Sequence, residues 1–265
     1  PDLYEAFYAD QDKFKELYVA YEAKDGIRKK VLSAVEVFSQ FLTERKDTGR
    51  ICLMNVDHAN SHGAFLPELA PIRMSNLCCE IDLPTKPLES AEDVNGEISL
   101  CTLSAINWGL INEPREFEKY CDLTVRGLDS LLDYQWYPVP AAERGTKNRR
   151  PLGIGIINLA YFLAKRGLKY DDNSLPIIDE FAEAWSYYLI KASSDLAKEK
   201  GAIPLNHETK YSLGKTPNDT YKKEVDELVP HVERMDWFNL RQDLIHFGIR
   251  NSTLMALMPA ETSAQ

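Results

Sequence analysis

The beginning of the chain carries apolar side chains at helical spacing. Residues 1–23 place them along one stripe, which predicts a helix. A second set follows at positions i, i+3, i+4, i+7 and i+11 and predicts a further helix over residues 31–42. The two stripes consist of Leu3, Phe7, Phe14, Leu17, Tyr18 and Tyr21, then Val31, Ala34, Val35, Phe38 and Leu42.

The next segments alternate between short apolar runs and turn-forming residues. The run RICLMNVD at 50–57 predicts a strand, and the following residues, 58–74, predict a long irregular connection. The segment SNLCCEIDLP, residues 75–84, is expected to be extended and to be ended by Pro84 and Pro87. The run ISLCTLSAIN at 98–107 predicts a second strand.

Helices and strands continue to alternate through the rest of the chain, apart from a loop-rich stretch at 202–235. The expected elements are a helix over 117–132, a strand leading into a buried helix over 150–167, a helix over 178–196, a helix from Asp236 to Gly248 and a strand over 253–258. This alternation predicts an α/β fold with a largely parallel sheet. No internal boundary is evident, so residues 1–265 are predicted to form one segment of a single domain.

The net charge, the length of the apolar runs and the cysteine count argue against several classes of function. The chain has 31 Lys and Arg against 41 Asp and Glu, a formal net charge of −10, which argues against binding to a nucleic-acid polymer. No apolar run approaches the roughly 20 residues of a membrane span. Five cysteines, an odd number, favour reduced thiols in a cytoplasmic protein. Cys52 and Cys121 lie in apolar patterns and are expected to be inert core thiols.

Two familiar motif patterns are incomplete. Gly153-Ile-Gly155 resembles the start of a dinucleotide-binding loop, but Asn158 occupies the third glycine position. His58 and His62 lie four residues apart in a segment that is not expected to be helical. The sequence therefore predicts no metal site and no dinucleotide site.

The segment 75–84 carries the strongest candidate chemistry. Alternate residues of an extended segment point the same way. One face would then hold Asn76, Cys78 and Glu80, and the opposite, apolar face would hold Leu77, Cys79 and Ile81. The Glu80 carboxylate disfavours a neighbouring thiolate, so Cys78 is expected to stay a neutral thiol suited to hydrogen-atom transfer. From these residues alone, a strand end with chance polar side chains remains the alternative.

Several longer stretches resemble one family. SNLCCEIDLPTKPL and NGEISLCTLSAINWG look like the active-site region of the large subunit of class I ribonucleotide reductases. The resemblance continues through YPVPAAERGTKNRRPLGIGIINLAYFLAKRG and WSYYLIKASSDLAKEKGAIP to RNSTLMALMPAETSAQ at the end. It covers the whole chain and is closest to enterobacterial and phage-type enzymes.

The resemblance implies a fold and a set of catalytic residues. The fold would be part of a ten-stranded α/β barrel, incomplete at both ends, with a finger loop inside it. Cys78 matches the cysteine that becomes a thiyl radical and removes the 3′ hydrogen of a ribonucleoside diphosphate. Glu80 matches the base for the 3′-hydroxyl proton, and Asn76 matches the amide at the 2′ side. Cys101 matches one of two cysteines that supply reducing equivalents.

The terminal MPAETSAQ resembles the diphosphate-binding turn of the family, where backbone N–H groups suit an anion. Glu261, Thr262 and Ser263 match polar residues that contact the ribose or the phosphates. Ala260 stands where the family often has serine, so one hydroxyl contact is expected to be lost or replaced by backbone. Cys79 is a second departure, because a leucine-like residue is usual there.

The resemblance also implies partners. The first redox cysteine, the effector-binding segments, the two radical-relay tyrosines and the C-terminal cysteine pair of the family have no match in this chain. The chain begins at Pro1 and is expected to be a segment of a longer protein, the alternative being a trimmed form of a smaller one.

The chain alone is therefore expected not to turn over. It would need the rest of the large subunit, a metal-containing radical-generating small subunit and a thioredoxin- or glutaredoxin-type reductant, and it would hold no cofactor itself. Two alternatives stay open. One is an inactive fragment or assembly module of the same enzyme. The other is a stand-alone thiol oxidoreductase, which would need a cysteine of low pKa.

Overall fold

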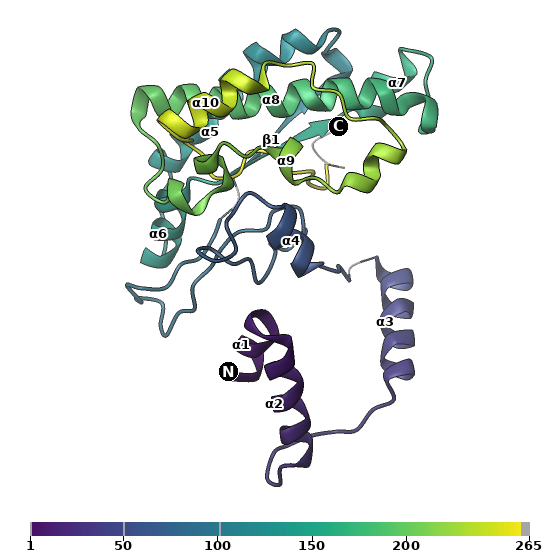
Figure 1. The fold of residues 1–265 in the computed structure, drawn as a ribbon, viewed down its shortest axis with the longest axis vertical. Helices are drawn as coiled ribbons and strands as arrows, with labels where there is room; N and C mark the ends of the chain where they lie inside the picture. The colour runs from purple at the N-terminus through teal and green to yellow at the C-terminus, as the bar shows by residue number, and fades with distance from the viewer. Residues whose placement is uncertain (1, 50, 101, 261–265) are drawn as a thin grey trace. The chain divides into compact units, whose positions relative to one another are not determined.

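The computed structural model describes residues 2–49, 51–100 and 102–260. Contacts divide the chain into two compact units, residues 1–53 and 54–265 (Figure 1). The two units are defined by their internal contacts. That residues 1–265 form one segment of a single domain stays a prediction.

The first unit consists of helices joined by short connections. The helical stripe predicted over 1–23 forms two helices, α1 (Asp2–Ala9) and α2 (Gln11–Ala23), because Asp10 interrupts the first and caps the second. The Asp10 carboxylate accepts a hydrogen bond from the backbone N–H of Lys13 at 2.9 Å. The second predicted helix is α3 (Ala34–Thr48), which begins after Ser33 and ends at Gly49 in the left-handed region.

The residues at the end of the first unit and the start of the second differ from the prediction. The predicted strand at 50–57 is wrong over its described residues, because 51–55 form no strand and α4 (Val56–His62) follows at once. The side chain of Asn60 donates to the carbonyl oxygens of Val56 and Ile72 at 2.9 Å each, so the helix is tied to the connection that follows it. Cys52 is exposed, which also contradicts its predicted place in a core.

The sheet is parallel, as predicted. β1 (Thr102–Asn107) pairs with β2 (Leu152–Ile157) in a register that joins Thr102 to Leu152. The predicted last strand is a bridged segment. Ile154 donates to the Leu254 carbonyl oxygen at 2.7 Å, and Ala256 donates back to Ile154 at 3.2 Å. The segment around residue 255 thus extends the sheet beyond β2 in the parallel direction.

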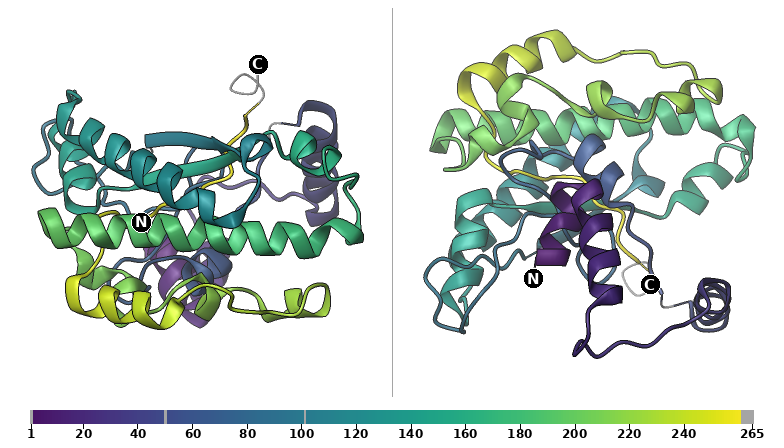
Figure 2. Two further views of the ribbon diagram at one scale, coloured as in Figure 1. Left: turned by 90° about the horizontal axis from the view of Figure 1, so that it is seen from above. Right: turned by 60° about the horizontal axis from the view of Figure 1, so that its bottom comes forward.

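Helices α5 (Phe117–Tyr134) and α8 (Leu175–Lys200) pack against each other beside the sheet (Figure 2). Both helices were predicted from their apolar spacing. The other elements of this unit are η1 (Trp108–Leu110), η2 (Pro114–Glu116), α6 (Pro140–Arg149), α7 (Leu159–Ala164), η3 (Asp172–Ser174), η4 (Asn206–Glu208), η5 (Lys210–Leu213), α9 (Pro217–Thr220), η6 (Lys223–Glu227) and α10 (Trp237–Phe247).

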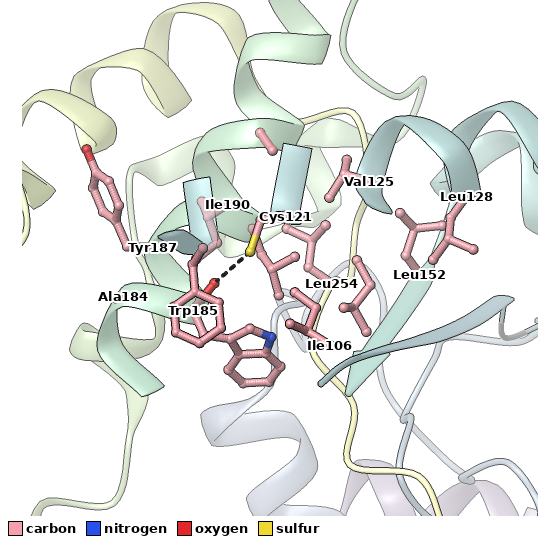
Figure 3. Packing of buried hydrophobic residues seen from close by; sticks show 14 of the residues in the cluster. Ile106, Cys121, Val125, Leu128, Leu152, Ala184, Trp185, Tyr187, Ile190 and Leu254 are labelled. Atoms are coloured by element: carbon pink, nitrogen blue, oxygen red, sulfur yellow. Dashed lines mark hydrogen bonds between the residues drawn. The ribbon is translucent and has the colours of Figure 1, made fainter. Parts of the chain in front are cut away.

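The main core lies between these helices and the sheet. Its centre is aromatic: the ring of Phe162 lies 5.5 Å from that of Trp108 and 4.8 Å from that of Phe181, measured between centroids. Figure 3 shows Cys121 in this core, with its thiol 3.8 Å from the Trp185 carbonyl oxygen. Burial raises the pKa of the Cys121 thiol well above its usual range, so the prediction of an inert core cysteine is confirmed at this position.

The two glycines of the Gly153-Ile-Gly155 sequence lie where neighbouring segments pack too closely for a side chain. A Cβ on Gly153 would lie 2.5 Å from Cδ1 of Ile81, and one on Gly155 would lie 2.7 Å from the Ala256 carbonyl oxygen. The two glycines of β2 therefore let the 75–82 loop and the C-terminal segment approach the strand closely. No helix in the described part of the chain combines the length and apolar character needed to cross a bilayer.

Candidate active site

Residues 75–82, here called the finger loop, form a closed turn and not the predicted extended segment. Ser75 and Asp82 form an antiparallel bridge, and Asn76 donates its backbone N–H to the Ile81 carbonyl oxygen at 3.2 Å. Cys79 has φ of 57°, in the left-handed region. The predicted alternation of faces is wrong for this reason, and Leu77, assigned to an apolar face, is 94% exposed.

The side chain of Asn76 closes the finger loop. Its Oδ1 accepts hydrogen bonds from the backbone N–H groups of Glu80 at 3.1 Å and Ile81 at 3.2 Å. Asparagine suits this place because its short amide bonds to nearby backbone and stabilises turns. This structural role was not predicted from the periodicity, although asparagine is a residue type typical of turns.

The two cysteines lie at the tip of the loop, and both are exposed. The Cys79 sulfur lies 3.0 Å from the Ser75 hydroxyl oxygen, so this side chain has a polar contact across the loop. Cys79 does not pack against apolar neighbours as predicted. The choice of Cys78 over Cys79 consequently rests on the family resemblance and no longer on strand geometry.

Glu80 and Asp82 lie on the side of the loop that faces a cavity of about 440 Å³. Both oxygens of the Glu80 carboxylate and Oδ1 of Asp82 are buried, without a hydrogen-bond partner among the described residues. Burial raises the pKa of Asp82. For Asp82, burial therefore favours the protonated carboxyl over the charged one.

The opposite wall of the cavity comes from α4, η5 and the segment after Ser252. His58 and His62 lie on the helix α4, contrary to the predicted irregular segment, with ring centroids 5.5 Å apart. His62 Nδ1 contacts the Thr220 carbonyl oxygen. The described residues contain no cluster of three or more metal-binding side chains.

Lys210 anchors the end of α4 in the same wall. Its Nζ donates to the carbonyl oxygens of Asn60 at 3.1 Å and Ser61 at 2.7 Å. Cations are favourable at the C-terminal end of a helix, where carbonyl oxygens lack partners. Burial, followed by the nearby charge of Lys215, lowers the pKa of Lys210.

A buried ion cluster holds the segment that leaves the finger loop. Arg149, at the end of α6, donates to the Glu208 carboxylate at 2.9 Å and also to the Glu97 carboxylate. Lys86 reaches Glu97 at 3.1 Å, and the two residues form an antiparallel bridge. Burial pushes the pKa of Glu97 upward, but the hydrogen bonds and charges of Arg149 and then Lys86 outweigh it and hold this pKa below its usual value.

Cys101, Glu261, Thr262 and Ser263 lie outside the described residues. Ala260 is half-buried at the end of the described C-terminal segment. Sequence reasoning also missed Asp82 and Arg149. The signal for Asp82 was its place two residues after Glu80.

A parallel strand pair, with a cysteine- and carboxylate-bearing loop packed against it, defines part of an α/β protein. A family model described as "Ribonucleotide reductase, barrel domain" matches residues 1–265, and the chain belongs to this family. The predicted fold class is thereby confirmed. The short open sheet is that of a segment of the barrel.

Relatives with similar sequences are named as subunits of one enzyme. The chain is 57% identical over 266 aligned positions to the ribonucleoside-diphosphate reductase subunit alpha of Haemophilus influenzae. It is 55% identical to the ribonucleoside-diphosphate reductase 1 subunit alpha of Escherichia coli and 45% identical to the ribonucleoside-diphosphate reductase subunit alpha of Enterobacteria phage T4. All of this chain is covered in each case, but only 35% of each relative, so the chain spans about a third of their length.

Proposed function

We propose that this chain is the catalytic-core segment of a ribonucleoside-diphosphate reductase large subunit, which makes deoxyribonucleoside diphosphates for DNA synthesis. The observation that supports this most is the finger loop. It exposes Cys78 at its tip and places Glu80, two residues later, in the lining of a cavity. A hydrogen-atom acceptor and a base on one rigid turn are what removal of a hydrogen atom and a proton from one sugar requires.

In the proposed reaction, a thiyl radical on Cys78 takes the 3′ hydrogen atom of the ribose, which forms the S–H bond and leaves a carbon radical. Glu80 takes the proton of the 3′-hydroxyl. The 2′-hydroxyl leaves as water with a proton from the thiol pair formed by Cys101 and a second cysteine from the rest of the subunit. The pair supplies two electrons and the hydrogen that replaces the hydroxyl at the 2′ carbon, and it becomes a disulfide. Cys78 then returns its hydrogen atom to the 3′ carbon, and Glu80 returns the proton to the 3′ oxygen.

Substrate binding is assigned to the end of the chain and to Asn76. Asn76 would bond at the 2′ side of the sugar, next to the two backbone N–H groups that it already accepts from. Residues 260–263 would bind the diphosphate largely through backbone N–H groups, because Ala260 has no hydroxyl to donate.

The reaction needs partners. We assign the radical to a metal-containing small subunit, the second redox thiol to the remaining segments of the large subunit, and re-reduction to a thioredoxin- or glutaredoxin-type protein. Cys78 and Cys101 must be thiols at rest, so a reducing compartment, the cytoplasm, is where the assembly would work.

The test is reassembly of the chain with the missing large-subunit segments and a small subunit, followed by measurement of ribonucleoside diphosphate reduction. Turnover is expected, and Cys78→Ser is expected to abolish it, since an alcohol does not form the required radical. Cys79→Ser is the matched control, because serine can keep the polar contact with Ser75. Loss of turnover in Cys79→Ser, with activity in Cys78→Ser, would reverse the assignment of the radical thiol.

Cys101→Ser tests the redox role separately. It is expected to prevent multiple turnover even when a small dithiol is the reductant. Activity that survives this change would contradict the role of Cys101. Binding of partner segments without any turnover would instead favour an assembly module. Rapid alkylation of the chain alone near neutral pH would favour a thiol oxidoreductase.

A further inference from the structure

Helix α5 has a second apolar face, which lies outside the core. Its buried side, which includes Cys121 and Val125, packs into the main core. On another side, four large apolar residues and a glycine fall within about 80° of the helix circumference, at 3.6 residues per turn. They are Tyr120, Leu123, Gly127, Leu131 and Tyr134, here called the outer stripe. Its four large residues are between 44% and 89% exposed, so no described element buries them.

The outer stripe reads the same in both directions. Leu123 and Leu131 lie four residues before and after Gly127, and Tyr120 and Tyr134 lie seven residues before and after it. In two antiparallel copies of α5 related by a two-fold axis at Gly127, each residue faces the one at the mirrored position of the other copy. Leucine then faces leucine, tyrosine faces tyrosine, and the two glycines meet at the axis. The stripe is therefore complementary to itself.

Neither the conformation nor the packing of this chain requires glycine at position 127. Gly127 lies inside α5, where glycine is less favourable than alanine. A Cβ there would meet nothing within 4 Å, in contrast to one at Gly153 or Gly155. The missing side chain instead leaves room for a second backbone to approach from outside the chain.

No charged residue interrupts the outer stripe. Thr124 and Ser130, three residues before and after the central glycine, are both small hydroxyl residues and would face each other in the same pairing. Each hydroxyl already donates to the α5 carbonyl oxygen four residues earlier, at 2.7 and 2.8 Å. Arg126, the cation nearest the centre, donates to the carboxylates of Asp122 and Glu199. Covering the stripe therefore leaves no hydroxyl donor and no charge without a partner.

We propose that the outer stripe is the contact surface for a second copy of this chain, with the two α5 helices antiparallel about a two-fold axis at Gly127. Two-fold dimers are the commonest symmetric assemblies, and their interfaces are self-complementary. A crossing angle of about 20° keeps two helices in contact along the roughly 21 Å from Tyr120 to Tyr134. One helix face is small beside the roughly 800 Å² per partner of a stable complex, so the dimer dissociates at micromolar concentrations. The inference does not depend on the proposed function.

The first experiment measures the mass of the 265-residue chain in solution by sedimentation velocity, from about 1 to 100 µM. The wild-type mass is expected to rise from that of one chain toward that of two. Leu131→Glu sets a charge against the stripe of the second copy and is expected to weaken association about tenfold or more. Leu228→Glu, the same change at another exposed leucine, is the matched control and is expected to associate like the wild type. A wild-type chain that stays monomeric throughout would overturn the proposal and favour a helix of another polypeptide as the occupant.

The second experiment tests the antiparallel register. Leu123→Lys is expected to weaken association, as Leu131→Glu does. The double variant Leu123→Lys/Leu131→Glu is expected to associate more tightly than either single variant, because opposite charges then face each other across the axis. Within one helix the two positions are eight residues apart and do not pair. A double variant that associates no better than the single variants would overturn the register.

The third experiment separates association from folding. Gly127→Gln replaces glycine by a good helix former in open space, so the urea midpoint of the monomer is expected to rise while association weakens. Association as tight as that of the wild type would overturn the role of the glycine at the axis. Phe38→Glu tests the other exposed apolar helix, α3. Association that is lost in Phe38→Glu and kept in Leu131→Glu would place the contact on α3 and overturn the proposal.

Discussion

Helices α3 and α8 have the same apolar spacing, but only α8 buries its apolar side chains. In α8 the repeating side chains are buried, including Phe181, Leu189 and Leu196. In α3 no residue is buried, and Val35 and Phe38 are 75% and 62% exposed. The same pattern therefore predicts which side of a helix is apolar but not what covers it. In the 54–265 unit the apolar side of α8 packs into a core. In the described part of the 1–53 unit the apolar side of α3 packs against no core.

The difference has an energetic consequence. Packing of an apolar face supplies most of the stability of a protein helix. A helix without it depends on its caps, which for α3 are Ser33 at the start and Gly49 at the end. We therefore expect core substitutions near α8 to be costly and the matching substitutions in α3 to be nearly neutral.

The comparison between the core near α8 and the exposed helix α3 is tested most strongly by a Phe→Ala substitution in each region. Phe162→Ala removes a fully buried ring that contacts Trp108 and Phe181, and we expect it to lower the free energy of unfolding by roughly 3–5 kcal/mol. Phe38→Ala is the matched control and should cost less than about 0.5 kcal/mol. Urea unfolding followed by circular dichroism measures both. Equal losses would show that α3 is covered after all.

Loss of a buried ion pair should lower the free energy of unfolding more than loss of a surface ion pair. Arg149→Leu leaves the Glu97 and Glu208 carboxylates buried without their cation, and we expect a loss of about 3 kcal/mol. Arg126→Leu is the control, since Arg126 pairs with Asp122 and Glu199, which are largely exposed, and should cost roughly 0.2–1 kcal/mol. Hydrogen exchange should rise in the finger loop for the first variant alone. The contrast fails if both variants unfold at the same urea concentration.

The Glu97 site adds a dependence on pH. Its pKa in the folded state lies below its usual value near 4.5, because Arg149 and Lys86 outweigh the effect of burial. The stabilisation is therefore fully present above pH 4.5 and is lost as the pH falls through the folded-state pKa. Between pH 6 and pH 3, we expect wild type to lose more of its free energy of unfolding than Glu97→Gln does. Parallel urea titrations at the two pH values measure this, and identical slopes would contradict it.

The smallest effect concerns the cap of α3. The Ser33 hydroxyl oxygen accepts from the Glu36 backbone N–H at a long 3.4 Å, so Ser33→Ala should cost only about 0.5 kcal/mol. That corresponds to an increase of about twofold in hydrogen exchange across α3. Ser39→Ala removes a hydroxyl within the same helix without removing a cap and should show no increase. Matching exchange rates in the two variants would mean that α3 does not depend on Ser33.

The sequence predicted the elements whose signal is local and repeated. Helices α5 and α8 follow from their apolar spacing, and α10 follows from a capping aspartate, Asp236, and a terminating glycine, Gly248. The parallel pairing of β1 with β2 follows from strands that alternate with helices. The segment around α4 was mistaken for a strand because Ile51 to Met54 are apolar, although no strand pairs with them.

The finger loop could not be predicted from periodicity. Its shape depends on the Asn76 side chain, which replaces a backbone partner, and on a left-handed backbone at Cys79 that few residue types adopt readily. The candidate catalytic residues came from the family resemblance. The shared cavity of Glu80 and Asp82 arises from α4 and η5, and residues 58 and 210 have no sequence signal that they lie across from the loop.

The anchoring of the loop has a consequence for synthesis. The strand-like segment before it is held by distant residues: Leu66 donates to the Glu208 carbonyl oxygen at 2.8 Å, and Lys210 donates to Ala64 at 2.7 Å. Contacts of such long sequence separation form late, because the chain between them must be closed first. A ribosome adds roughly 5–20 residues per second, so roughly ten seconds pass between emergence of the thiol and arrival of its anchors. During that interval Cys78 is an exposed cysteine on a nascent chain, before it belongs to any site.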